Sequence, residues 1–114
     1  MLTIDELRAF GADVDEGLSR MMNNEGFYLR MVGMGIDDKN YAKLEKAIAE
    51  DDLDAAFEAA HALKGILANL SLTPMARTAG EITEMLRSRT RTDYSPFLED
   101  LMAKREELIR IRNK

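Results

Sequence analysis

The stretch of sequence that decides the fold is DLDAAFEAAHALKGILANL, residues 52–70. Its apolar side chains recur at steps of three and four residues, which is the spacing of one face of an α-helix. The stripe consists of Leu53, Ala56, Phe57, Ala60, Leu63, Leu67 and Leu70. A stripe of this width predicts a helix that packs one whole side into a protein core.

The only histidine of the chain, His61, does not belong to this stripe. At 100° per residue, it lies roughly 130° from the centre of the stripe. Gly65 and Ala68 share its side of the predicted helix. Lys64 lies at the edge, where its stem can rest on the core while its ammonium points outward. A glycine inside a helix lowers its stability by about 1 kcal/mol relative to alanine, which suggests that the space at Gly65 has a use.

The first part of the chain carries two helix-start patterns. Thr3–Glu6 reads as a capping box, and Asp13–Glu16 repeats the same arrangement with aspartate at the cap. Gly11 is expected to end the first of these helices. Both helices are predicted to be short.

A third short helix is predicted over residues 25–34, and a longer one follows it. The apolar contacts of the third helix are expected to be Phe27, Met31 and Met34. Gly35 is expected to end this helix, and Asp37 to cap the next one, which runs through DDKNYAKLEKAIAEDD, residues 37–52.

Beyond residue 70, the same helical rhythm continues. Thr73 and Pro74 are expected to be the N-cap and first residue of a new helix. The connection SLT, residues 71–73, is so short that the two helices must form an antiparallel hairpin. A last helix is predicted to begin near Asp93 or Ser95. The sequence thus predicts an all-α fold, an antiparallel four-helix bundle with additional short N-terminal helices, in one domain over residues 1–114.

Composition excludes several classes of protein. The chain of 114 residues is 46% hydrophobic and 32% charged, which is typical of a globular protein rather than a disordered one. A net charge of −5 disfavours nucleic acid as a partner, and no apolar run is long enough to span a membrane. One histidine and no cysteine make a metal site improbable. We expect a cytoplasmic protein, because the N-terminus also lacks the pattern of a signal peptide.

The surroundings of His61 favour phosphoryl chemistry over an inert surface histidine, the plainest alternative. A neutral imidazole is nucleophilic near pH 7, and the ammonium of Lys64 can neutralise charge on a phosphoryl group attached to that ring. The missing side chain at Gly65 lets another protein approach closely.

The run AHALKG, residues 60–65, followed by ANL, residues 68–70, resembles the signature of histidine-containing phosphotransfer (HPt) domains. The resemblance implies that His61 is the phosphoacceptor and Lys64 the phosphate-facing cation. It also implies that Gly65 and Ala68 belong to the face that docks a receiver domain. Two positions depart from the family pattern: Ser71, where many members have glycine, and Thr83, where some relatives have a longer polar residue near the imidazole.

The resemblance further implies a two-component phosphorelay. His61 would accept a phosphoryl group from the phosphoaspartate of a receiver domain, or from a kinase, and pass it to another receiver. The chain would carry no cofactor of its own, and the Mg²⁺ ion would belong to the partner receiver. We expect a phosphocarrier without kinase activity, because no glycine-rich nucleotide loop is present. The partners would be receiver domains, a hybrid histidine kinase, or both.

A monomer is expected, because a dimer formed through the His61 face would block docking. The initial methionine favours a stand-alone module. A silent helical adaptor, which binds a partner and transfers nothing, is the alternative function.

Overall fold

The computed structural model describes residues 1–114 and consists of helices only, which confirms the predicted all-α class. The seven helices are α1 (Ile4–Phe10), α2 (Val14–Arg20), α3 (Glu25–Ile36), α4 (Asn40–Ala49), α5 (Leu53–Asn69), α6 (Thr73–Arg87) and α7 (Ser95–Arg112). No helix is both long enough and apolar enough to cross a lipid bilayer.

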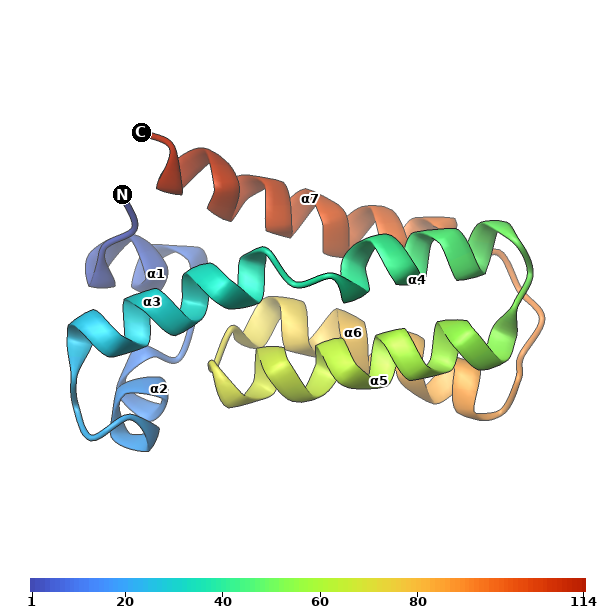
Figure 1. The fold of residues 1–114 in the computed structure, drawn as a ribbon, viewed down its shortest axis with the longest axis horizontal. Coiled ribbons are helices and arrows are strands. Elements are labelled where there is room, and N and C mark those ends of the chain that lie inside the picture. The colour runs from blue at the N-terminus through green and yellow to red at the C-terminus, as the bar shows by residue number, and fades with distance from the viewer.

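The last four helices form the predicted antiparallel bundle (Figure 1). α5 packs between α4 and α6, and α7 packs on α6. Each of these helices runs opposite to the one before it, because the connections are short. α3 precedes α4 along the same edge of the molecule, with a break at residues 37–39 (Figure 1).

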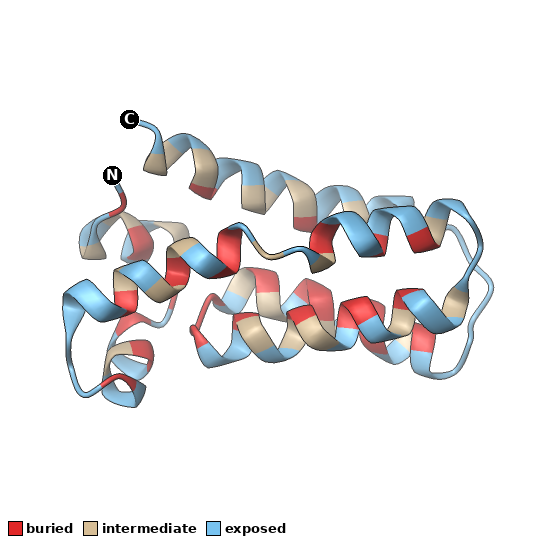
Figure 2. Ribbon diagram, in the orientation of Figure 1, coloured by how far each residue is buried: buried red, intermediate tan, exposed pale blue.

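One continuous apolar core joins the short N-terminal helices to the bundle. A single cluster of 25 buried residues has members in every helix, from Leu7 in α1 to Leu108 in α7. The buried positions lie on the inward sides of the helices (Figure 2). All three tyrosines, Tyr28, Tyr41 and Tyr94, are buried in it. The N-terminal helices therefore complete the core of the bundle.

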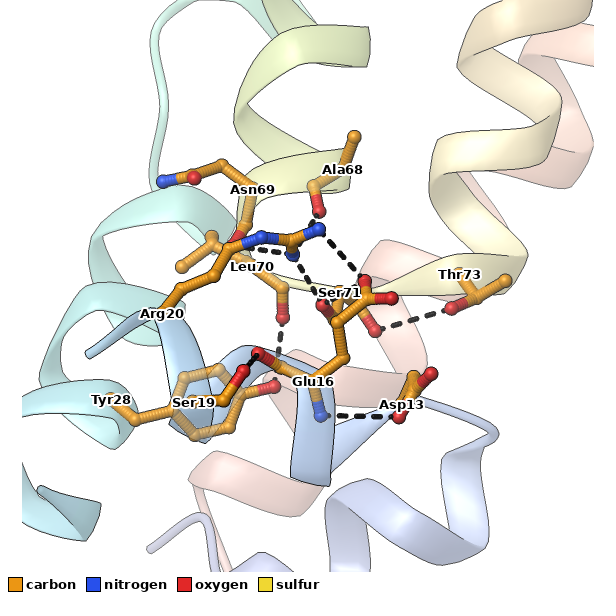
Figure 3. Close-up of polar contacts among 10 residues, drawn as sticks. All are labelled: Asp13, Glu16, Ser19, Arg20, Tyr28, Ala68, Asn69, Leu70, Ser71 and Thr73. Atoms are coloured by element: carbon orange, nitrogen blue, oxygen red, sulfur yellow. Dashed lines mark hydrogen bonds and ion pairs between the residues drawn. The ribbon is translucent and has the colours of Figure 1, made fainter. Parts of the chain in front are cut away.

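A polar network fixes α2 to the turn between α5 and α6 (Figure 3). The Ser71 hydroxyl donates to Oε1 of Glu16 at 2.8 Å, and its oxygen accepts a hydrogen bond from Nη1 of Arg20 at 2.7 Å. The hydroxyl of Tyr28 donates to the carbonyl of Leu70 at 2.8 Å. The Ser71 hydroxyl and the Arg20 guanidinium hold the pKa of the Glu16 carboxyl below its usual value. Ser71 has a φ of 56°, in the left-handed region that favours glycine, which explains why glycine would suit this position.

Two arginines of α7 hold the joint between α3 and α4. Arg105 donates from Nε to the carbonyl of Ile36 at 2.7 Å, and its guanidinium carbon lies 4.5 Å from the ring centroid of Tyr41. Arg112 binds the Asp37 carboxylate through both Nη atoms, at 2.8 and 3.0 Å. The hydroxyl of Tyr41 has no hydrogen-bond partner. The break in the helix is thus held from across the molecule.

The predicted contacts of α3 were wrong in part. Met34 is 61% exposed and Phe27 is 41% exposed. The buried apolar side chains of α3 are instead Tyr28, Val32 and Ile36. The buried residues follow the predicted ones by one or two positions. The buried side of α3 is set by contact with α7 and the α5–α6 turn, and local sequence does not reveal these contacts.

The predicted boundary between α3 and α4 was also wrong. α3 continues through Gly35 to Ile36, and Asp37 is its C-cap rather than the N-cap of α4. A Cβ atom at Gly35 would lie 2.5 Å from Cδ1 of Leu70, so this glycine permits close packing and does not end the helix. The residue before α4 is Lys39, and Asp38 accepts the backbone N–H of Asn40 at 2.8 Å.

The hairpin between α5 and α6 is present as predicted, but Thr73 is not the N-cap of α6. Leu72 occupies that position, Thr73 is the first helical residue, and Pro74 is the second. Leu72 is buried, so its side chain anchors the start of α6 in the core. α7 begins at Ser95, one of the two predicted starts, and Asp93 accepts the Ser95 N–H at 2.9 Å.

Candidate functional site

His61 lies in the middle of α5 and faces solvent, as predicted. The opposite side of the helix is buried through Ala56, Ala60, Leu63 and Leu67. Gly65 and Ala68 are exposed and share the outward side with His61. The stripe that packs α5 into the core is therefore what turns the imidazole toward solvent.

The imidazole of His61 stacks on the ring of Phe57, one turn earlier in α5. The two ring centroids lie 5.6 Å apart, and the ring planes differ by 13°. Phe57 was predicted as a member of the buried stripe, but it is only partly buried. It lies at the margin of the core, where one part of the ring contacts apolar neighbours and another part contacts the histidine.

Two arginines from the end of α6 and the following turn cover the Phe57 ring. The guanidinium carbons of Arg87 and Arg89 lie 5.2 and 5.1 Å from the ring centroid. Arg87 pairs with Glu84 at 3.3 Å, and Arg89 pairs with Asp54 at 2.8 Å. Cations at this distance from an aromatic face are attracted by its quadrupole. The ring on which His61 stacks is therefore contacted by residues from α6 and the α6–α7 turn.

Lys64 lies at the edge of the outward side, with 42% of its side chain exposed. Its Cε atom is 4.0 Å from the position that a Cβ atom at Gly80 would occupy, so the lysine stem crosses toward α6. Its ammonium is 3.9 Å from Oε1 of Glu84, the same carboxylate that pairs with Arg87. The stem rests on the bundle as predicted, and the ammonium has an exposed acidic neighbour.

Gly65 has open space above it. A Cβ atom built at this position would meet no atom within 4 Å outside its own helix. At Gly17, by contrast, a Cβ atom would lie 2.6 Å from the Tyr28 ring. Packing within the chain therefore requires a glycine at position 17 and does not require one at position 65.

Thr83 does not join the outward face. Its side chain is fully buried, and its hydroxyl donates to the carbonyl of Ala79 at 2.7 Å within α6. The longer polar residue that some relatives have at this place thus has no counterpart here. No group of three or more His, Asp or Glu side chains is arranged to hold a metal ion.

Sequence reasoning missed the contact of His61 with Phe57 and the residues that surround Phe57 and Lys64. The spacing of four residues between Phe57 and His61 was a usable signal, because such residues are adjacent on a helix. Arg87, Arg89 and Glu84 are 23 to 28 residues further along the chain, and only the register of the α5–α6 hairpin brings them there. Arg89 has a φ of 52°, which local sequence does not predict.

The fold and this face define an all-helical module with a single histidine presented to solvent. The Hpt domain model matches residues 38–114, about two thirds of the chain. The protein therefore belongs to the Hpt domain family, whose members are phosphocarriers of two-component signalling rather than kinases and interact with receiver domains or kinases. The match includes His61, Lys64, Gly65 and Ala68, and it begins after α3. No curated protein and no solved structure is significantly similar to the chain.

Proposed function

We propose that His61 is the phosphoacceptor of this module. It takes a phosphoryl group from the phosphoaspartate of a receiver domain, or from a kinase, and passes it to a second receiver. The observation that carries the proposal is the open space above Gly65, on the same exposed side of α5 as His61. Glycine weakens a helix, and packing within the chain does not require it at this position. Its small size leaves room beside the exposed nucleophile for the active site of a second protein.

The transfer needs only the chemistry of a neutral imidazole. The lone pair of a ring nitrogen attacks phosphorus in line, and an N–P bond forms. The P–O bond to the aspartate breaks, and the carboxylate leaves with its electron pair. The ring is cationic until its other nitrogen releases a proton to water. Positioning and charge neutralisation account for most of the catalysis in such a step, and the reverse sequence delivers the group to a second receiver.

Lys64 is the cation that we assign to the phosphoryl group. Its present partner, Glu84, is 3.9 Å away and exposed, and ion pairs of this kind contribute little to stability. A dianionic phosphoryl group on a neighbouring turn would therefore attract the ammonium more strongly than the carboxylate does. Gly65 and Ala68 would lie under the docked receiver. The protein would need no cofactor of its own, since the Mg²⁺ ion would belong to the receiver.

The same proposal includes the setting in which transfer takes place. We infer one domain over residues 1–114, acting in the cytoplasm as a monomer on receiver domains, a hybrid histidine kinase, or both. A monomer leaves the exposed side of α5 free for docking, and the continuous core supports a single unit.

The test is phosphoryl transfer from a panel of phosphorylated receiver domains to the full chain. We expect acid-labile, alkali-stable label on the wild type and none on His61→Gln. Lys64→Met should slow labelling about ten- to a hundredfold, because a hydrogen bond to a charged group contributes about 1.5–3 kcal/mol. Circular dichroism should give equal helicity for all three proteins. A folded wild type that takes no label from any receiver would favour the silent adaptor instead.

A further inference from the structure

We propose that Phe57 is a positioning residue for the phosphotransfer reaction. It holds the imidazole of His61 in the orientation in which a ring nitrogen can attack the phosphoryl group of a docked receiver, and in which the phosphoryl group on that nitrogen can be attacked by the aspartate of a second receiver. This inference rests on the proposed function, because it assigns a second residue to the same site.

The ring stack is the observation that singles out Phe57. With centroids 5.6 Å apart and planes within 13° of parallel, the two rings have the offset-stacked separation that aromatic pairs prefer. An exposed histidine on a helix otherwise moves among several rotamers. The stack selects a subset of them before any partner arrives, so less side-chain freedom is lost when the receiver docks.

Phe57 can impose an orientation because it is itself held on more than one side. Its partly buried ring packs against the core. Arg87 and Arg89 lie over the ring at 5.2 and 5.1 Å, and each guanidinium is paired with a carboxylate, Glu84 or Asp54. The side chain of Arg89 also donates to the carbonyl of Leu86, in the last turn of α6. The support for the stack thus comes from two helices and a turn.

Orientation matters to this reaction more than to most uses of a histidine. In-line transfer requires the nitrogen lone pair, phosphorus and the leaving oxygen to be collinear, and a small misplacement lowers the rate strongly. The stack orients the ring but does not change the intrinsic nucleophilicity of the ring nitrogen. Loss of the stack should therefore lower the rate constant within the docked complex and leave the reactivity toward a small, freely tumbling donor unchanged.

The experiment compares wild type, Phe57→Leu and Phe57→Tyr with two donors. One donor is a phosphorylated receiver domain at varied concentration, followed by rapid quench. The other is phosphoramidate, which transfers its phosphoryl group by breaking the P–N bond and releasing ammonia, with no docking surface. Leucine keeps an apolar side chain against the core but removes the stack, whereas tyrosine keeps the ring.

We expect Phe57→Leu to lower the maximal rate constant of receiver-dependent transfer about three- to tenfold. The receiver concentration at half-maximal rate should change less than twofold, and so should labelling by phosphoramidate. Phe57→Tyr should behave as wild type with both donors. Nuclear Overhauser contacts between the rings of residues 57 and 61 should be present in wild type and in Phe57→Tyr.

Three results would overturn the positioning role. The first is an unchanged maximal rate constant in Phe57→Leu, and the second is an effect confined to the half-saturating concentration, which would make Phe57 a docking contact. The third is an equal loss with phosphoramidate, which would mean that the nucleophile itself had changed. A wild type that takes no label from any receiver would overturn the proposed function as well, so the two failures are distinguishable.

Discussion

Single glycines in this chain serve opposite purposes, and the difference bears on function. Gly35 lies under Leu70, whose Cδ1 would be 2.5 Å from an added Cβ atom. Gly65 faces open space on the outward side of α5. The first glycine is used by the fold, and the second leaves room that nothing in the chain fills.

Alanine at these two positions should therefore change stability in opposite directions. Gly65→Ala should raise the free energy of unfolding by about 1 kcal/mol, because alanine favours the helix and meets no neighbour. Gly35→Ala should lower it by about 1–3 kcal/mol through overpacking against Leu70. Urea denaturation followed by circular dichroism measures both. A destabilised Gly65→Ala would contradict the assignment of free space at that position.

A larger side chain at position 65 tests the use of that space. Gly65→Gln should leave the fold intact and reduce labelling by phosphorylated receivers, while labelling by phosphoramidate continues. Receiver-dependent labelling at the wild-type rate with every receiver would mean that the space is not a docking surface.

At the scale of helices and turns, the α5–α6 hairpin has two tasks. It sets the register that brings Arg87 and Arg89 to Phe57, and it receives α2 through the Ser71 network. Serine in a left-handed conformation is strained by about 1–2 kcal/mol. Its bonds to Glu16 and Arg20 offset that strain, since each contributes about 1 kcal/mol.

Substitutions of Ser71 should separate the strain from the bonds. Ser71→Ala keeps the strain and loses both bonds, so the free energy of unfolding should fall by about 1–2 kcal/mol. Ser71→Gly loses the same bonds but removes the strain, and should be about 1 kcal/mol more stable than Ser71→Ala. Thermal and urea unfolding of the three proteins check this order. Equal stability of the two variants would mean that the turn relaxes without strain.

The elements of this fold differ in how far sequence could predict them. α5 and the hairpin were predicted well, because the stripe of α5 is wide and the turn is too short for any other path. The contacts of α3 were predicted poorly, because distant segments set the side of the helix that is buried. The carbonyl of Leu70 accepts the Tyr28 hydroxyl from 42 residues away, and Arg105 of α7 binds the carbonyl of Ile36 from 69 residues away. In the candidate site, the exposure of His61 followed from its angle to the stripe. The contacts of Arg87 and Arg89 with Phe57 depend on the register between α5 and α6, and no local sequence pattern indicates them.

At the scale of the whole molecule, side-chain hydrogen bonds at two places supplement the shared apolar core in joining the N-terminal helices to the bundle. One is the Ser71 network at the hairpin, and the other is the joint before α4, which Arg112 of α7 reaches through Asp37. The family match begins at residue 38, so both attachments connect residues before the match to residues within it. This arrangement ties the core of the family module to a segment outside it.

The pair between Asp37 and Arg112 should make this attachment depend on pH. The hydrogen bonds from Arg112 lower the pKa of the Asp37 carboxyl in the folded protein. Its contribution is therefore present above the unfolded value of about 3.9 and is lost as the pH falls through the folded value. Because the Asp37 side chain is 60% exposed, we expect at most about 1 kcal/mol.

Asp37→Asn should accordingly lower the urea midpoint at pH 7 and have a smaller effect at pH 3. Arg112→Gln should give a similar loss at pH 7, and the double variant should be little worse than either single one. A loss from Asp37→Asn that is independent of pH would show that the pair is not the cause.

Because its tyrosines are buried, the protein should show its alkaline unfolding as a change in phenolate absorbance. Burial raises the pKa of each phenol, that of Tyr41 to about 12, and the chain has no tryptophan to mask them. A phenol with a raised folded pKa contributes stability that is present below about pH 10, its unfolded value, and is lost as the pH rises through the folded one. The part of the phenolate absorbance that comes from Tyr41 should therefore appear in one steep step that coincides with unfolding. An alkaline titration in a simple spectrophotometer would then report the global stability of the molecule without any label.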